Sequence, residues 1–243
     1  MSLLRSAGFL TIGDLASTLA VSHMTVRRDL HTLEGAGQLR MVHGGASLTP
    51  ASLRGATFPD DGNGEARIRV ADRAAAMVGE WDTIALDAGP TALAVARALP
   101  ADFRGSVITH SMPVLQLLDE QSTGTRTVAL GGELLSERHA FVGPTTEAAL
   151  DQLRARTFFL SPAAVDALGV YARSPAEASV QRRLIEIAQR VVLVVTHEVY
   201  TNSAPVRIAA LDRLGALVSD RPPPRAVAAG LRSADVGMQV MAS

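Results

Sequence analysis

One predicted helix near the amino terminus carries a basic and polar face that suits nucleic acid. Val26, Leu30 and Leu33 are spaced like the buried stripe of a helix that begins after Ser22, a good N-cap residue, and ends at the Gly-Ala-Gly of residues 35–37. Arginine can donate two hydrogen bonds to a guanine or clamp a phosphate. We therefore interpret this segment as a recognition helix for the major groove of double-stranded DNA. The candidate DNA-contacting residues on it are Ser22, His23, Thr25, Arg27, Arg28 and His31.

Glycines and polar side chains follow the short aliphatic runs of the larger part of the chain. In sheets of parallel strands, ligands bind outside the carboxyl ends of the strands, so these loops are candidates for a small-molecule site. The first loop, residues 87–91, precedes a helical run and can present backbone N–H groups and a helix N terminus to an anion. The other loops are residues 109–111, 131–132, 161–166 and 196–198. Any one of them taken alone is more often ordinary turn chemistry than a binding loop.

The basic helix needs neighbours to hold it. Residues 11–19 have apolar positions at helical spacing and a capping pair at their start, which predicts a first short helix. Residues 38–48 predict two strands around a glycine turn, the wing of a winged helix, with Arg40 and His43 beside the backbone of the duplex. A small helical hairpin with a solvated basic face is the alternative interpretation.

The rest of the chain alternates short aliphatic runs with helical patterns. Buried runs separated by helices predict an α/β domain with a mostly parallel sheet that is covered on both faces. The runs are residues 83–86, 107–109, 127–130, 157–160, 191–195 and 216–219.

Composition divides the chain into four parts. Residues 1–48 form the expected DNA-binding domain, and residues 49–64, rich in proline and glycine without periodicity, form the expected linker. The α/β effector-sensing domain is expected at residues 65–224. Residues 225–243 are set apart as a carboxyl-terminal tail with no assigned role.

The bulk composition excludes several kinds of chemistry. The 243-residue chain has a net charge of −1, so DNA binding must come from a local basic patch. All 23 basic residues are arginines, which rules out a lysine Schiff base, and the chain has no cysteine for a disulfide or a thiolate metal site. The six histidines are dispersed, so we predict no metal, and we expect no cofactor. No apolar run is long enough to span a membrane or forms a secretory signal, which fits a cytoplasmic protein.

The segment LASTLAVSHMTVRRDLHTLEGAGQLRMVHGGA closely resembles the DNA-binding head of the DeoR family of bacterial regulators. That family's pattern is a helix, a V-S turn, T-[IV]-R-R-D-L, L-E-x-x-G, and a wing that ends R-x-H-G-G-A. The resemblance implies a winged helix-turn-helix. Only Leu3, Leu4 and Arg5 precede the turn at Ala7-Gly8, so the family's first helix is either short here or begins upstream of the printed sequence.

The loops of the larger domain resemble, in their order, the sensor domain of the same family. That domain is similar in fold to ribose-5-phosphate isomerase and binds phosphorylated sugars or related metabolites. DAGPT stands at the family's phosphate loop, THS at its T-N-S loop, LGGELLSERHAFVGP at its glycine-glycine loop, and SPAEASVQRRLIEIAQRVVLVV at its late helix and strand. The resemblance implies these effector-binding residues: Asp87, Ala88, Gly89, Thr91, His110, Ser111, Gly131, Gly132, Arg138 and Glu177.

The chain departs from the family pattern at the expected pocket. Pro90 replaces a hydroxyl residue and removes a backbone donor, and His110 stands where the family usually has asparagine. The late strand normally ends in D-x-[ST]-K, but residues 196–199 here are Thr-His-Glu-Val. Arg138 fits a solvated loop as well as it fits a ligand contact. Glu177 lies at a helix start, where a carboxylate interacts favourably with the helix dipole even without a ligand.

The expected function is that of a transcriptional regulator, a repressor or an activator, whose operator affinity a sugar phosphate or similar metabolite modulates. The head holds only four arginines against Asp14, Asp29 and Glu34, so one copy would bind weakly, and we expect dimers or tetramers. One alternative is a sugar-phosphate isomerase with an attached head, for which only Asp166 and Glu177 remain as acids. Another alternative is a pure oligomerisation module.

Overall fold

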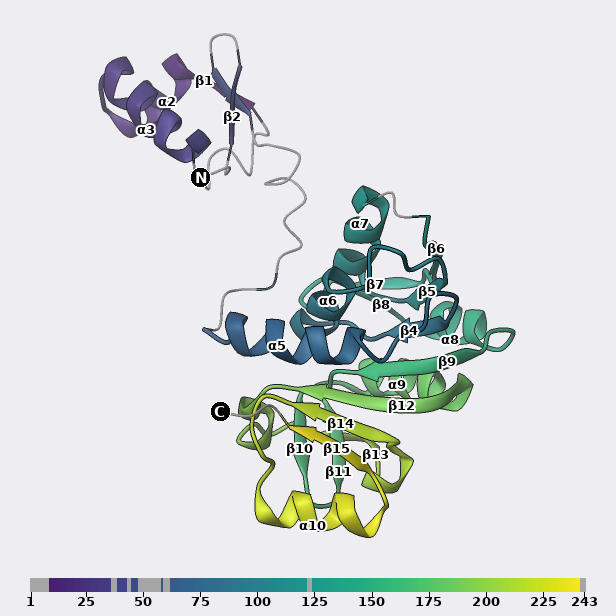
Figure 1. Ribbon diagram of the computed structural model, residues 1–243. Helices are drawn as coiled ribbons and strands as arrows, with labels where there is room; N and C mark the ends of the chain where they lie inside the picture. Colours follow the sequence, from purple (N-terminus) through teal and green to yellow (C-terminus); the bar gives the residue numbers. More distant parts are fainter. Residues whose placement is uncertain are drawn as a thin grey trace. The chain divides into compact units, whose positions relative to one another are not determined.

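The computed structural model describes residues 9–35, 39–42, 45–47, 58, 62–121 and 124–240. The chain divides into two compact units, Met1–Thr57 and Phe58–Ser243. The division falls inside the linker expected at residues 49–64, most of which lies outside the described residues. Each unit has its own apolar core, and Figure 1 shows the elements of both.

The smaller unit contains the two expected helices. Helix α2 (Ile12–Leu19) begins with a capping box, in which the Thr11 hydroxyl accepts a hydrogen bond from the Asp14 backbone at 3.0 Å while the Asp14 carboxylate accepts the Thr11 N–H at 3.3 Å. It ends at Ala20, whose φ of 54° lies in the left-handed region. Helix α3 (His23–Gly35) follows after a three-residue turn, residues 20–22. The predicted helix-turn-helix is therefore confirmed.

A three-stranded antiparallel sheet completes the smaller unit. Strands β2 (Arg40–Val42) and β3 (Gly45–Ser47) form the expected wing, and β1 (Phe9–Thr11), which the sequence pattern did not predict, pairs with the other side of β3. Arg40 lies in β2, whereas His43, in the turn between the strands, lies outside the described residues. The core of this unit consists of Ile12, Leu15, Ala16, Val26, Leu30, Leu39 and Ala46.

A seven-stranded sheet, parallel at every pairing, is the framework of the larger unit. Its strands lie in the order β15-β14-β12-β9-β4-β5-β6. Each of the six predicted aliphatic runs lies in or overlaps one of these strands, and the predicted mostly parallel α/β fold is confirmed. The strand bounds are β4 (Thr83–Leu86), β5 (Ser106–Thr109), β6 (Arg126–Ala129), β9 (Ala155–Leu160), β12 (Ala188–Val195), β14 (Ala216–Ser219) and β15 (Gly237–Val240).

Helices cover both faces of this sheet, which is why its central strands read as unbroken aliphatic runs. In β4, for example, Ile84 and Leu86 pack with α5 (Gly64–Ala75), α6 (Pro90–Arg97) and α7 (Met112–Gln121) in one cluster. The neighbouring Ala85 belongs to the opposite cluster. That cluster includes α8 (Pro144–Leu150), α9 (Pro175–Ile187) and α10 (Arg225–Ser233).

Smaller elements lie beside the sheet (Figure 1). A hairpin is made by β7 (Glu133–Leu135) and β8 (Ala140–Val142). A second small sheet joins β10 (Ala164–Asp166), β11 (Gly169–Ala172) and β13 (Val206–Ala209). Two single-turn helices, η1 (His197–Tyr200) and η2 (Leu211–Arg213), complete the fold.

The strand order contains one switch point. From β4 the chain proceeds to β5 and β6 on one side, and then returns to place β9, β12, β14 and β15 on the other side. The connections after β4 and β9 therefore diverge, and open α/β sheets bind ligands in the crevice that such a switch creates at the carboxyl ends of the strands.

Residues 225–240 are not a separate tail, so the expected boundary of a tail at residue 225 was wrong; residues 241–243 lie outside the described residues. Residues 225–233 form α10, and residues 237–240 form β15, which pairs in parallel with β14 from Ala216↔Gly237 to Ser219↔Val240. The sequence signal is weak because β15 is a partly exposed edge strand without an aliphatic run. Helix α10 buries only two apolar residues, Val227 and Leu231.

In the part of the chain that the structure describes, no helix is both long enough and apolar enough to cross a membrane.

If α10 belongs to the folded core, removing its central side chain must destabilise the domain. We expect Leu231→Ala, at a fully buried position, to lower the free energy of unfolding by about 2–5 kcal/mol. The neighbouring Arg232→Ala, at an exposed position, should change it by about 0.5 kcal/mol or less. Urea unfolding of the full chain measures both changes in the free energy of unfolding. Equally small changes in the two variants would mean that α10 is not part of the folded core.

Candidate effector site and DNA-contacting helix

The Asp87 carboxylate lies at the switch point of the sheet and is fully buried. Its Oδ1 accepts hydrogen bonds from the Ala88 N–H at 2.8 Å and from Nε2 of His110 at 3.1 Å. Its Oδ2 accepts from the Ser161 N–H at 3.0 Å and from Nε2 of Gln181 at 2.9 Å. These donors follow β4, β5 and β9 or lie on α9, so one carboxylate ties together the ends of three adjacent strands and a covering helix.

His110 is held at both ring nitrogens. Its Nε2 faces Asp87, and its Nδ1 lies 3.0 Å from the carbonyl oxygen of Phe141 in β8. Both neighbours are hydrogen-bond acceptors, so the geometry is satisfied when the ring donates from both nitrogens. Through these two contacts His110 links the end of β4 to the β7–β8 hairpin.

The loop after Asp87 leads into helix α6. Gly89 has a φ of +136°, which favours glycine, and Pro90 occupies the first turn of the helix. A Cβ atom added at Gly89 would lie 3.6 Å from Nη2 of Arg138 and 3.9 Å from Oγ of Ser161. A guanidinium group and a hydroxyl therefore converge on the loop at the start of α6, where Thr91 is also buried.

Arg138 is fixed in place by an ion pair. Its Nε donates to Oε1 of Glu177 at 2.8 Å, and both side chains are largely buried. The other carboxylate oxygen of Glu177 accepts from the Ser174 hydroxyl at 3.1 Å, and Ser174 caps the start of α9. Since the pair uses Nε, the Nη2 end of the guanidinium remains beside Gly89. Arg138 is thus part of a fixed network and not of a solvated loop.

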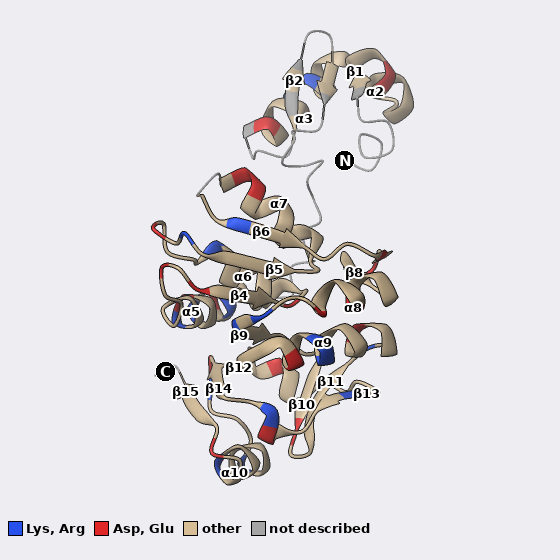
Figure 2. Cartoon of the chain, turned by 90° about the vertical axis from the view of Figure 1, so that its right-hand side faces the viewer, with Lys and Arg blue, Asp and Glu red and all other residues tan. Residues whose placement is uncertain are grey.

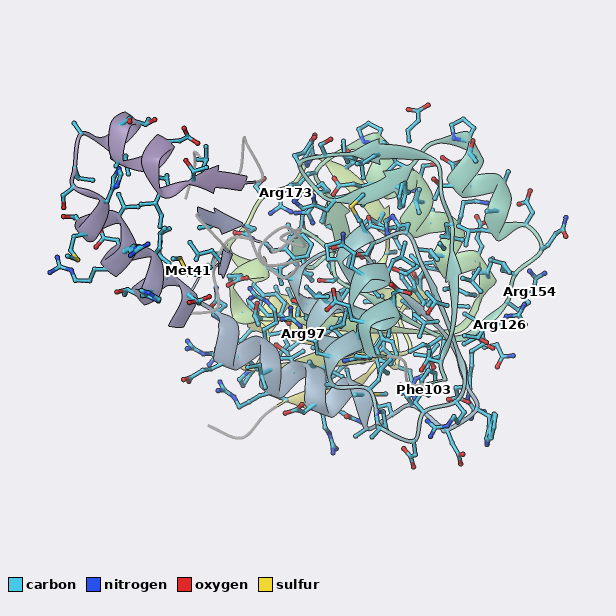
Figure 3. All side chains as sticks on the ribbon, turned by 90° about the horizontal axis from the view of Figure 1, so that it is seen from above. Met41, Arg97, Phe103, Arg126, Arg154 and Arg173 are labelled. Atoms are coloured by element: carbon cyan, nitrogen blue, oxygen red, sulfur yellow. The ribbon has the colours of Figure 1, made fainter. Side chains whose placement is uncertain are left out.

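A cavity of about 250 Å³ lies over these groups, within the larger unit. Its charged side chains are Arg138, Arg173 and Glu198. Arg173, labelled in Figure 3, is an exposed residue between β11 and α9. Helix α9 itself carries charges of both signs (Figure 2). The other lining residues are Phe58, Pro90, Thr91, Ser161, Pro162, Ala163, Thr196, Val199 and Asn202.

Glu198 gives the cavity an acceptor on its η1 side. Its Oε1 lies 3.9 Å from Nη2 of Arg67. Its Oε2 is buried and has no hydrogen-bond partner among the described residues. A buried acceptor without a donor is costly, so a ligand hydroxyl or ammonium group in the cavity would satisfy it.

Tyr200 anchors η1, the turn that carries Glu198. Burial raises the pKa of Tyr200 to about 12, and the nearby Asp220 contributes in the same direction, while the hydrogen bond with Ser219 acts against both. The phenol therefore stays protonated and donates to Oγ of Ser219 at 3.5 Å, and Ser219 in turn donates to the Arg221 carbonyl at 2.8 Å.

The sequence-predicted effector residues fall into three groups. Thr91 and Arg138 line the cavity, and Asp87, Ala88, Gly89, His110 and Glu177 form the network that supports it. Ser111, Gly131 and Gly132 are not among the lining residues. Instead, the Gly131 carbonyl accepts the Thr146 hydroxyl at 2.7 Å. A Cβ atom at Gly132 would lie only 2.1 Å from that hydroxyl oxygen, so Gly132 allows α8 to pack closely.

Four lining residues lie outside both the candidate loops and the predicted site residues: Phe58, Arg173, Val199 and Asn202. Glu198 lies in the candidate loop 196–198 that follows a predicted strand, although it was not among the predicted effector-binding residues. Arg173 precedes a helix cap and carries no motif. The folding of η1 and of the β11–α9 connection brings Glu198 and Arg173 to the cavity.

Helix α3 presents its basic residues to the outside. Val26 and Leu30 are buried, whereas His23, Arg27 and Arg28 are exposed. His31 is also exposed, with its Nδ1 3.5 Å from the Glu34 carboxylate.

Ser22 and Thr25 serve the helix itself. The Ser22 hydroxyl accepts the Thr25 N–H at 3.2 Å, and the two hydroxyl oxygens lie 2.9 Å apart in a hydrogen bond. These two side chains cap α3.

Within the described ranges, no group of three or more His, Asp or Glu side chains is arranged to hold a metal ion.

Comparison with known proteins identifies the class. Residues 1–50 match the DeoR-like helix-turn-helix domain, and residues 62–221 match the DeoR C-terminal sensor domain. The two matches define a transcriptional regulator with a DNA-binding head and an effector-sensing domain. The chain belongs to the DeoR family, which confirms the resemblance seen in its sequence.

Two relatives span most of the chain. It is 34% identical over 230 residues to the transcriptional repressor AccR of Agrobacterium fabrum, covering 90% of this chain and 86% of that protein. It is 28% identical over 234 residues to the glycerol-3-phosphate regulon repressor of Escherichia coli, covering 93% and 90%. Among solved structures, ribose 5-phosphate isomerase A of Neisseria gonorrhoeae aligns with a TM-score of 0.42 and 15% identity over 57% of this chain and 54% of that chain.

The DeoR family consists of transcriptional regulators, so the alternative of a sugar-phosphate isomerase does not hold.

The network around Asp87 makes a prediction about stability. His110→Ala removes one of the four hydrogen-bond partners of a fully buried carboxylate, and we expect it to lower the free energy of unfolding by about 1–3 kcal/mol. His110→Asn keeps a side-chain donor toward Asp87 and should lose clearly less. Urea unfolding of the two variants decides the point, because equal losses would mean that the ring contributes packing and not a hydrogen bond to the carboxylate.

Proposed function

We propose that this regulator binds a small phosphorylated metabolite, such as a sugar phosphate, in the cavity at the switch point, and that this binding modulates its affinity for an operator. The observation that carries the proposal is the convergence of the Arg138 guanidinium and the start of α6 on one cavity. The cavity is at the small end of the usual range for ligand pockets, about 300–1,000 Å³, which favours a compact metabolite.

The start of α6 supports an anion for a second reason. The first N–H groups of a helix have no hydrogen-bond partner within the helix. Pro90 has no backbone N–H group, so the amides of Thr91 and Ala92 are the donors at the start of α6. They belong to the end of α6 that follows Gly89, beside which Nη2 of Arg138 lies, and the helix dipole favours negative charge at this end. Arg173 adds a second positive side chain to the lining.

The opposite side of the cavity suits the carbon skeleton of the effector. Glu198 can accept hydrogen bonds from hydroxyl groups, and Thr196 and Asn202 add further polar groups. A molecule with a phosphate at one end and hydroxyls at the other satisfies both sides of this lining. The family pattern places a lysine near this position, so the effector itself can differ from that of other members.

We assign repression as the sense of regulation, since both relatives described above are named repressors. The DNA is contacted by His23, Arg27, Arg28 and His31 of α3, with Arg40 and His43 of the wing beside the duplex backbone. Because the head has only four arginines, we propose that two or four copies assemble on repeated half-sites. Such a regulator works in the cytoplasm, where its operator is.

The effector proposal is tested by Arg138→Ala. We expect thermal shift with a panel of sugar phosphates and inorganic phosphate to identify at least one compound that stabilises the full chain. Calorimetry should then show about 10- to 100-fold weaker binding of that compound to Arg138→Ala, the loss expected for a hydrogen bond to a charged group. Arg154→Ala removes the same charge at an exposed position before β9 and should bind normally. Undiminished binding to Arg138→Ala would place the anion elsewhere.

The recognition-helix assignment is tested by Arg27→Ala and Arg28→Ala. Both side chains are exposed, so the variants should fold, and each should abolish specific binding to the DNA upstream of the protein's own gene. Fluorescence anisotropy at one stated salt concentration measures this, with a scrambled duplex for the non-specific level. Operator affinity that both variants retain would contradict the assignment.

A further inference from the structure

Met24 is the most exposed large hydrophobic residue in the described part of the chain, with a relative exposure of 79%. It is the second residue of α3. At about 100° of rotation per residue, it shares with Arg28 and His31 the side of the helix that faces away from Val26 and Leu30. An apolar side chain therefore stands in the middle of the face that is otherwise polar and basic.

The neighbouring hydroxyls leave Met24 in a prominent position. Ser22 and Thr25 bond to each other and to the helix start, so they are occupied in capping. In helix-turn-helix proteins it is the N-terminal residues of the recognition helix that contact base edges. At this end of α3, His23 and Met24 are the exposed side chains not engaged in the cap.

Methionine has no hydrogen-bond donor and only a weak acceptor, so it reads a base edge through apolar contact. The C5-methyl group of thymine is the one apolar group that base pairs present in the major groove. We infer that Met24 contacts the methyl group of a thymine in each half-site and so selects an A·T pair at that position. This inference rests on the proposed placement of α3 in the major groove.

The side chain suits such a contact. It is unbranched and flexible, so its terminal methyl can settle against a neighbouring methyl group without demanding a fixed geometry. The Arg28 side chain, one helical turn further on, supplies the polar contact to an adjacent base or phosphate. Arg28 would contribute most of the affinity for DNA, and Met24 would set the preference for one base pair.

The test uses the full chain and a duplex selected from a random-sequence pool by its binding. Each thymine of this duplex is replaced in turn by deoxyuridine, which keeps the Watson–Crick pairing and lacks only the C5-methyl group. We expect one position per half-site at which the replacement weakens binding about fourfold, the factor for removing one methyl group from a buried contact. Binding that no deoxyuridine replacement weakens would overturn the inference.

Three variants separate this contact from the general DNA binding of α3. The selected duplex is called the thymine duplex, and its counterpart carries deoxyuridine at the sensitive position. Met24→Ala should weaken binding to the thymine duplex and bind the two duplexes equally. Met24→Leu, which keeps an apolar side chain, should still bind the thymine duplex more tightly. Arg28→Ala should instead lose specific binding to the thymine duplex and to its deoxyuridine counterpart alike. A deoxyuridine effect that persists in Met24→Ala overturns the role of Met24 alone. If Arg28→Ala also binds normally, the placement of α3 in the groove fails with it.

Discussion

A fully buried carboxylate at the switch point of a parallel sheet is the constraint on which the sensor unit depends. Burying the charge of Asp87 is costly unless donors surround it, and its four hydrogen bonds come from segments that follow three neighbouring strands and from one helix. Satisfying this one group therefore fixes where β4, β5 and β9 end relative to one another. The loop that begins α6 starts at the same residue, so its position is set as well.

The positive charge of the site is also held in place by hydrogen bonds within the folded chain. Arg138 comes from a hairpin turn, a place where side chains are usually mobile, but its bond to Glu177 orders it before any ligand arrives. Glu177 is held in turn by the cap of α9. Because the guanidinium is already positioned, an anion that enters the cavity need not supply the free energy of ordering it. Glu198, with an unpaired oxygen, faces the same cavity and sets a second requirement for the ligand.

The pattern of apolar residues in the sequence predicted the strands that are buried on both faces, and it did not predict the strands that are partly exposed. The runs at 83–86 and 216–219 coincide with β4 and β14 because both strands are covered on both faces. Strand β15 was missed because it is an exposed edge, and the β7–β8 hairpin because its strands are short. Asp87 and His110 were found by the rule that polar residues follow parallel strands. The same rule picked out the loop 196–198, which contains Glu198. Arg173 was not found, since the connection that carries it reaches the cavity only after folding.

The central claim is that one chain couples a phosphate site to an operator site. The most direct test is an anisotropy titration of the upstream DNA with the wild-type chain and with Arg138→Ala, each with and without the sugar phosphate that stabilises the wild type. We predict equal operator affinity for the two proteins without the metabolite, and a shift of about 5- to 150-fold on adding it to the wild type alone. An equal shift in both proteins, or no shift in the wild type while the metabolite is bound, would contradict the account.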